Sequence, residues 1–403
     1  LFSDLVSKTD IILNKTTFQS NIFNTNFFCL KIFGIWSGIV PVKNYKYYSI
    51  MFLFINLIAY DILLTVNLVF TPRKIEFLIR EVIFYFTEMA VAAKALMILR
   101  MRRNFLEVFN ILDSEYFAGE DEFSRSIIFK NNSLYKRYFK YLAILSHLAF
   151  TSQVFYPFFS TVIFGTAKEL PICQYYFLSN EIIRKYFTVL FIYQSIGIYS
   201  HLHYNLNIDS LMAGLMYLLF TQLKVLNHEM NNLRVSEYEI KTGHEMSRLR
   251  KILEHYNLIL EYAGKIQHIL SLTMFVQFGI SAVVICVVLY GITLPSSVES
   301  QMFMVLYLLI MTLQIFLPGW LGTHISCESQ ELVFAAYNCE WISRSEGFKR
   351  SIILFSQRAN TAIELSGLTM FPLSLNTFTS IMKSAYSLFT LIRNVEVNQT
   401  EDR

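Results

Sequence analysis

The sequence predicts an all-α membrane protein with seven transmembrane helices. Hydrophobic residues make up 54% of its 403 residues and charged residues only 16%, and the mean hydropathy is +0.43. Such a composition is too apolar for an ordinary soluble domain. Apolar runs of about 20 residues also recur along the chain, and this is the length of helix that crosses the hydrocarbon of a bilayer. Both observations indicate that lipid surrounds much of the chain.

Seven apolar runs define the predicted spans. They cover approximately residues 48–70, 79–100, 139–164, 186–207, 269–292, 301–322 and 373–393. Five prolines lie between spans, where a missing N–H costs nothing: Pro41, Pro72, Pro171, Pro295 and Pro372. Pro157 and Pro318 lie inside spans, and Gly319 follows Pro318. We therefore expect a bend in the sixth helix.

The positions of lysine and arginine predict the orientation. These residues cluster after the second span, before the third, and between the fourth and fifth, all on the side that holds the amino terminus. Because cytoplasmic segments carry an excess of Lys and Arg, we expect the amino terminus in the cytoplasm. An odd number of spans then places the carboxyl terminus outside the cell.

Helical periodicity continues past the predicted membrane surface. Residues 208–232, 245–268 and 325–341 keep apolar residues at three- and four-residue spacing among charged ones, which is typical of amphipathic helices. We therefore expect cytoplasmic extensions of helices four, five and six. A further amphipathic helix over residues 348–365 is expected to form the first part of helix seven. Without an internal repeat or flexible linker, the chain is predicted to form one seven-helix domain over residues 1–403.

The sequence lacks the motifs of catalysis and of cofactor binding. It contains no P-loop, zinc-protease or nucleophile-elbow motif, so an enzyme, a catalytic residue and a cofactor are not expected. His201 and His203 are two residues apart. On a helix they point in different directions, so no metal site is predicted. The formal net charge of +4 gives no indication of nucleic acid as a partner.

Three ionisable residues lie inside predicted spans, where a charge costs free energy and usually persists only for function or pairing. For Glu88 two interpretations are open: a polar contact for a ligand, or a pair with a neighbouring helix through His147 or Gln153. The pair is favoured. Lys94 lies on the same helix as Glu88, and Lys383 lies midway along the seventh span. For Lys383 a contact with another helix or subunit is favoured over an ion path, because a central cation repels permeating cations.

Aromatic side chains crowd the outer halves of several spans, with few polar groups among them. Such walls suit a small, mostly apolar ligand held by shape and dispersion. For any one aromatic residue alone, packing against lipid or protein is favoured. The candidate ligand-binding residues are Phe84, Tyr85, Glu88, Phe150, Gln153, Phe155, Phe191, Tyr193, Gln194, Phe303 and Leu306.

The seventh span carries the most specific motif. Residues 372–378 read Pro-Leu-Ser-Leu-Asn-Thr-Phe, and residues 385–391 read Ala-Tyr-Ser-Leu-Phe-Thr-Leu. Together they closely resemble the carboxy-terminal signature of insect odorant receptors. Weaker similarities to this family lie at residues 30–36, at Asp209 and at Trp341. The orientation predicted from the charges is also that of the family.

This resemblance implies an odour-tuning subunit of a ligand-gated, non-selective cation channel. The subunit would form a heterotetramer with olfactory co-receptor subunits in the plasma membrane of olfactory sensory neurons. Its ligand would be a volatile odorant, bound between helices two, three, four and six in the outer half of the bilayer. Helix seven would line the pore for cations, with a gate formed by Tyr386, Leu388, Leu391 and Ile392. The co-receptor carries a long insertion between helices four and five, and the short segment 234–244 favours a tuning subunit instead.

Three other classes of membrane protein are possible alternatives. A gustatory-type receptor channel is the nearest, but its TYxxxxxQF-like ending is not matched by Ala385, Tyr386, Ile392 and Arg393. A G-protein-coupled receptor is less favoured, because the predicted orientation is opposite and the DRY and NPxxY patterns are missing. A small-solute transporter is also less favoured, since neither repeats nor interrupted helix pairs are visible.

Overall fold

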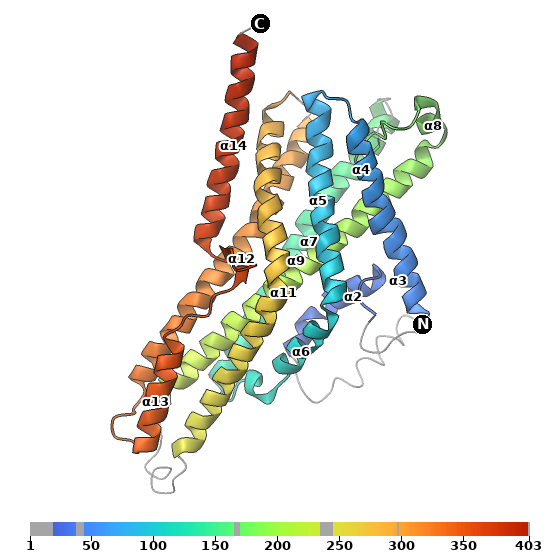
Figure 1. Cartoon of the computed structure of the whole chain (residues 1–403). Coiled ribbons are helices and arrows are strands. Elements are labelled where there is room, and N and C mark those ends of the chain that lie inside the picture. Colours follow the sequence, from blue (N-terminus) through green and yellow to red (C-terminus); the bar gives the residue numbers. More distant parts are fainter. Residues whose placement is uncertain (1–18, 38–43, 165–169, 234–244, 296–297, 402–403) are drawn as a thin grey trace.

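A computed structural model describes residues 19–37, 44–164, 170–233, 245–295 and 298–401 of the chain. Seven long helical stretches run along the described part of the molecule (Figure 1). They are α3, η2 and α4 in series (Tyr45–Leu53, Phe54–Ala59, Tyr60–Phe70), α5 (Ile75–Arg100), α7 (Glu122–Phe164), α9 (Phe187–Asn231), α11 (Glu245–Thr293), α12 (Val298–Asn338) and α14 (Leu375–Glu401). The predicted all-α fold with seven long helices is confirmed.

Shorter elements connect these helices. They are η1 (Gln19–Phe23), α2 (Asn24–Ile32), α6 (Arg102–Leu112), η3 (Glu115–Ala118), α8 (Asn180–Lys185), α13 (Glu346–Ala359), β1 (Ser366–Gly367) and β2 (Phe371–Pro372). The two strands pair antiparallel, with Ser366 opposite Pro372. Among them, α6 and α13 are amphipathic and bury one face each, for example through Phe105 and Phe348.

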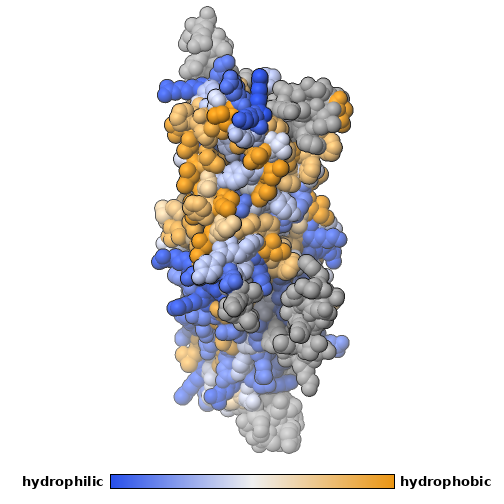
Figure 2. Space-filling view, turned by 90° about the vertical axis from the view of Figure 1, so that its right-hand side faces the viewer, coloured by the Kyte–Doolittle hydropathy of each residue, from blue (hydrophilic) through white to orange (hydrophobic). Residues whose placement is uncertain are grey.

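Five of the long stretches are apolar enough over their length to cross a membrane by themselves. They are Tyr45–Phe70, Phe77–Arg100, Phe187–Asn231, Met246–Thr293 and Ser300–Asn338. The helices α7 and α14 carry more polar residues but pack against members of this set, α7 on α9 and α14 on α11. On the face shown in Figure 2, hydrophobic side chains gather in the upper half and hydrophilic ones in the lower half. The molecule therefore has a lipid-compatible half and a water-compatible half.

The predicted extensions of helices four, five and six are continuous with their spans. Helix α9 runs to Asn231, α11 begins at Glu245, and α12 continues through Pro318 to Asn338 without a break. Helix α7 also has an extension, which the sequence did not predict: it begins at Glu122 rather than near residue 139. Tyr135 of this extension packs on Phe23 with ring centroids 5.6 Å apart, so contacts with the rest of the chain hold a polar-looking stretch in place.

The helix predicted over residues 348–365 is shorter than expected and ends at Ala359. Side chains of two neighbouring helices bind the backbone that follows. The Ile363 N–H donates to Ser329 Oγ at 2.9 Å, and the Ser366 N–H donates to Gln267 Oε1 at 2.8 Å. These groups replace the helical hydrogen bonds, so the chain leaves the helix early and enters the β1–β2 hairpin.

Helix α9 forms the centre of the fold. It packs against α12, α7, α11, α5 and α2, and nearly all side chains from Ile208 to Leu226 are buried. Gly214 has no side chain where the rings of Phe23 and Tyr135 approach its backbone. The other helices are thus arranged around one buried helix that runs through both halves of the molecule.

Helix α14 begins in close contact with α12. A Cβ atom at Gly322 would collide with the backbone carbonyl of Leu373, and one at Gly319 would press on Ser374. The Leu375 N–H, in the first turn of α14, donates to Thr323 Oγ1 of α12 at 3.0 Å. Glycine on α12 therefore permits the backbone approach that fixes where α14 starts.

Replacing Gly322 by Ala should destabilise the protein by about 1–3 kcal/mol, the usual cost of forcing a methyl group into a filled space. The thermal unfolding midpoint of the detergent-purified protein measures this loss. Gly279→Ala is the matched control, because nothing lies within 4 Å of a Cβ at that helical position and alanine is the better helix former. Equal midpoints for the two variants would show that the contact is not tight.

Candidate functional site

A cavity of about 100 Å³ lies between α5, α7, α9 and α12. Each helix lines it with residues three or four positions apart, which share one helix face. On α9 these are Ile198, His201, Leu202, Asn205, Leu206 and Asp209. A cavity of this size has room for several water-sized groups. It therefore suits a small organic molecule.

Five of the predicted ligand-binding residues line this cavity: Phe84, Glu88, Phe150, Gln153 and Phe303. The rings of Phe84 and Phe303 stack with centroids 5.7 Å apart, and both phenylalanines belong to the same wall. Beside them, the hydroxyl groups of Thr87 and Tyr307 are hydrogen-bonded to each other across α5 and α12. One end of the cavity is thus mainly aromatic.

Six predicted ligand-binding residues lie outside the lining of the cavity: Tyr85, Phe155, Phe191, Tyr193, Gln194 and Leu306. Phe155 is 46% exposed, and Tyr193 donates its hydroxyl hydrogen to the carbonyl of Ile55 at 3.0 Å. Gln194 is fully buried, and its side chain binds backbone groups of the chain and not the cavity. Its amide oxygen accepts from the Ile172 N–H at 3.1 Å, and its amide nitrogen donates to the Cys173 carbonyl at 3.0 Å. It holds the segment between α7 and α8 against α9.

Glu88 forms a pair, but not with His147 or Gln153 as expected. Its carboxylate contacts Nδ1 of His201 on α9, and it also lines the cavity. The other ring nitrogen of His201 donates to the Asn56 carbonyl at 3.0 Å. A second carboxylate lies near the same histidine, with Asp61 Oδ1 3.9 Å from His201 Nε2.

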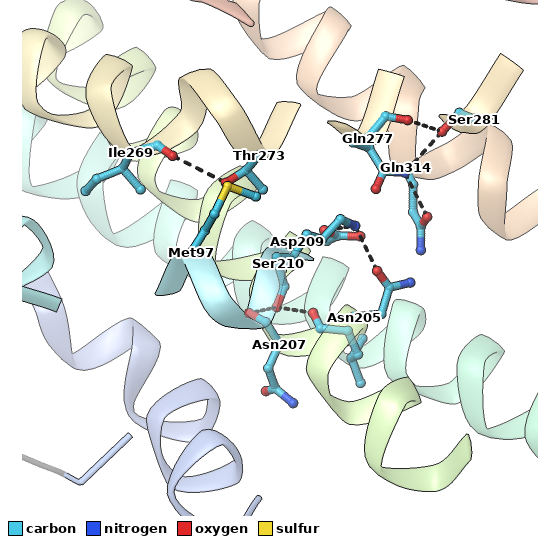
Figure 3. A network of polar contacts seen from close by, with 12 residues as sticks. Met97, Asn205, Asn207, Asp209, Ser210, Ile269, Thr273, Gln277, Ser281 and Gln314 are labelled. Carbon is cyan, nitrogen blue, oxygen red and sulfur yellow. Dashed lines mark hydrogen bonds and ion pairs between the residues drawn. The ribbon is translucent and has the colours of Figure 1, made fainter. Parts of the chain in front are cut away.

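Polar residues line the other end of the cavity, namely Asn205, Asp209 and Gln314. Lys94 on α5 is almost completely buried and donates to Asp209 Oδ1 at 2.7 Å and to Asn205 Oδ1 at 2.9 Å. Nearby, Gln277 of α11 donates to Gln314 Oε1 of α12 at 3.1 Å. Figure 3 shows Asn205, Asp209, Gln277 and Gln314 close together between the helices. The cavity thus runs from an aromatic end to a polar end.

The two histidines do point in different directions, as their spacing predicts. His201 faces Glu88, whereas His203 stacks on Phe33 with ring centroids 4.5 Å apart. Among the described residues, no three His, Cys, Asp or Glu side chains are grouped as they would be to hold a metal ion. Both histidines are parts of the helix packing.

The four predicted gate residues lie on one helix and face away from the rest of the chain. Tyr386 and Leu391 are 61% and 60% exposed, and Leu388 and Ile392 are also exposed. Ala385 of the same helix is buried. Lys383 is exposed as well. Helix α14 runs along one side of the bundle (Figure 1), and it leaves these apolar side chains exposed.

Sequence comparison identifies relatives over most of the chain. The model of the family described as 7tm Odorant receptor matches residues 74–386. Odorant receptor 59a of Drosophila melanogaster is 28% identical over 220 residues, which are 50% of this chain and 54% of that protein. Odorant receptor Or1 of Anopheles gambiae is 25% identical over 267 residues, 58% of this chain and 62% of that protein. The chain spans about half the length of the curated relatives it matches.

A solved structure with the same fold is the insect olfactory receptor OR5 from Machilis hrabei in complex with eugenol. It superimposes with a TM-score of 0.81 over 93% of this chain and 97% of that one. A second structure of the same receptor gives a TM-score of 0.80 over 92% of this chain. Because sequence identity is only 18%, this likeness shows the fold alone.

Replacing Lys94 by Met should destabilise the protein by about 3–5 kcal/mol, because it leaves the enclosed Asp209 carboxylate without its partner. Lys251→Met is the matched control. Lys251 and Glu120 form an ion pair at 2.9 Å, but both side chains are more than half exposed, so the loss should stay below about 1 kcal/mol. Unfolding midpoints in detergent measure both effects. Adding Asp209→Asn to Lys94→Met should recover part of the loss, and no recovery would contradict the pairing.

Proposed function

The chain belongs to the 7tm odorant receptor family, and from this we propose that it is the odour-binding subunit of a ligand-gated, non-selective cation channel. Its relatives are odorant receptors and not enzymes. The observation that carries the proposal is the cavity between α5, α7, α9 and α12, which is small, mostly apolar and lined by four different helices. A ligand that fills it contacts all four helices at once.

Helix α12 connects this cavity to the helix proposed to line the pore. Tyr307, Met311 and Gln314 line the cavity from its upper part. One to two turns further on, Gly319 and Gly322 of the same helix contact the start of α14. A ligand that prefers one position of α12 over another would therefore also favour one position of α14. It shifts a closed–open equilibrium by its difference in affinity for the two states.

The exposed face of α14 supports a role in a pore formed by several subunits. Leu388, Leu391 and Ile392 are apolar and point away from their own chain. A ring of such side chains closes a pore by excluding water. We assign the neighbouring positions to olfactory co-receptor subunits in a heterotetramer, in the plasma membrane of olfactory sensory neurons.

The charge distribution and the surface support one orientation. The lower half of the molecule contains the end of α9, the start of α11 and the end of α12 (Figure 1), and α11 forms charged pairs such as Lys251–Glu120 and Lys265–Glu107. Segments rich in Lys and Arg are retained in the cytoplasm. We therefore place this half and the amino terminus in the cytoplasm, and the end of α14 outside the cell.

Patch recording from cells that express this chain with an olfactory co-receptor tests the proposal. A broad panel of volatile compounds should evoke cation currents that neither subunit gives alone. In the same cells, a tag at the carboxyl end of the chain should be stained without permeabilisation. Robust responses from this chain alone would contradict the tuning-subunit assignment. Silence towards every volatile, with the chain and co-receptor both at the surface, would contradict the odour-binding function.

The gate is tested by Ile392→Ser in the same cells. A hydroxyl group wets the narrow part of the pore, so basal current without ligand should rise severalfold. Leu148→Ser is the control, because Leu148 is an exposed apolar residue of α7, 53% exposed, far from α14 in the chain. An unchanged basal current in Ile392→Ser would remove this residue from the constriction.

A further inference from the structure

The polar end of the cavity contains a carboxylate oxygen without a hydrogen-bond partner. Asp209 lines the cavity, and its Oδ1 atom forms an ion pair with Lys94 Nζ at 2.7 Å. Its second oxygen, Oδ2, is enclosed and has no partner among the described residues. An enclosed carboxylate oxygen left unpaired is unfavourable and is normally matched by a donor. Because Asp209 lines the cavity, this oxygen is a candidate acceptor for a ligand there.

The side-chain amides of Asn205 and Gln314 already accept hydrogen bonds through their oxygens, and their N–H groups can donate to a ligand. Asn205 Oδ1 accepts a hydrogen bond from Lys94 at 2.9 Å, and Gln314 Oε1 accepts one from Gln277 at 3.1 Å. Each side-chain amide has two N–H donors besides this oxygen. Both residues line the cavity with Asp209. The polar end thus combines one vacant carboxylate acceptor with amide donors.

The aromatic end lies at a defined distance from this polar group. On α9, Ile198 and Asp209 both line the cavity, and at about 1.5 Å per residue they lie roughly 16 Å apart along the helix axis. On α12, Phe303 and Gln314 are separated by the same number of residues. The stacked rings of Phe84 and Phe303 are therefore at one end and the vacant carboxylate oxygen is at the other.

We propose that the cavity selects neutral ligands that carry a hydroxyl group at one end of an apolar body. The hydroxyl hydrogen would be donated to Asp209 Oδ2, its oxygen would accept from Asn205 or Gln314, and the apolar body would extend toward Phe84 and Phe303. A hydroxyl is the smallest group that both donates and accepts. Alcohols and phenols thus form the ligand class. This inference rests on the proposed odour-binding function of the same cavity.

Two neighbouring ligand classes fit less well. An ether or a hydrocarbon of the same shape has no hydrogen to donate and leaves Asp209 Oδ2 unpaired. An ammonium ion can donate, but Lys94 already neutralises Asp209 at 2.7 Å and would repel a second cation at close range. The Lys94–Asp209 ion pair therefore favours a ligand that donates a hydrogen bond but carries no charge.

The test uses matched compounds on cells that express the chain with the co-receptor. One set is phenethyl alcohol, its methyl ether, phenethylamine and propylbenzene; the other is hexanol, its methyl ether, hexylamine and heptane. In at least one set the alcohol should be ten- to a hundredfold more potent than its ether and hydrocarbon, the ratio expected for one unpaired buried group. Equal potency of alcohol and hydrocarbon, or responses only to amines or ethers, would overturn the inference and leave the odour-binding function intact. Silence towards all of them and towards the broad panel would contradict the function itself.

Two variants locate the selectivity in the cavity. Asp209→Asn replaces the vacant acceptor by an amide, so the potency ratio of alcohol to ether should fall to about one. Phe303→Leu is the control at the other end, where alcohol and ether should lose potency together and keep their ratio. An unchanged ratio in Asp209→Asn would overturn the assignment of the hydroxyl contact. If Asp209→Asn does not reach the surface, the comparison of compounds on the unaltered chain still decides the proposal.

Discussion

The burial of α9 is the constraint on which the rest of the structure depends. In the hydrocarbon of a bilayer, backbone N–H and C=O groups find no water, so the chain satisfies them inside continuous helices. Helix α9 continues without a break beyond the lipid-compatible half, where nearly all its side chains from Ile208 to Leu226 are buried by other parts of the chain. The cavity wall and the centre of the hydrophilic half are consequently parts of one helix. Helices α2, α5, α7, α11 and α12 are positioned by packing on it.

Polar groups along α9 set which helix faces which. Asn26 of α2 donates to Ser210 Oγ at 2.7 Å, and Tyr262 of α11 donates to the Leu215 carbonyl at 2.9 Å. Above them, the Lys94–Asp209 ion pair links α5 to α9. Because each buried polar atom needs a specific partner, a rotation of any of these helices would leave several of them unpaired. The position of the cavity is fixed by this pairing as much as by hydrophobic packing.

The sequence predicted the fold better than the site, for a physical reason. Apolar run length marks the spans, and aromatic crowding pointed to Phe84, Phe150 and Phe303. Periodicity shows which residues share a helix face, but the face that meets the cavity depends on how the helices pack. Tyr85 is one position from Phe84 and so lies about 100° around the helix, outside the lining. The polar end was missed because Asn205, Asp209 and Gln314 take their role from Lys94 and Gln277 on other helices. The three- and four-residue spacing from Ile198 to Asp209 was the available signal.

The contact between Gly322 and Leu373 has a consequence for how such a receptor can diversify. The lower part of α12 has no spare volume where it meets α14, since even a methyl group would collide there. In the upper part of the same helix, Phe303 and Tyr307 line the cavity. Substitutions can thus reshape the lining of the cavity while the contact between α12 and α14 below it keeps its dimensions. On the function proposed above, ligand preference and coupling to α14 would then be separable traits of one helix, and new preferences could evolve without a change in that contact.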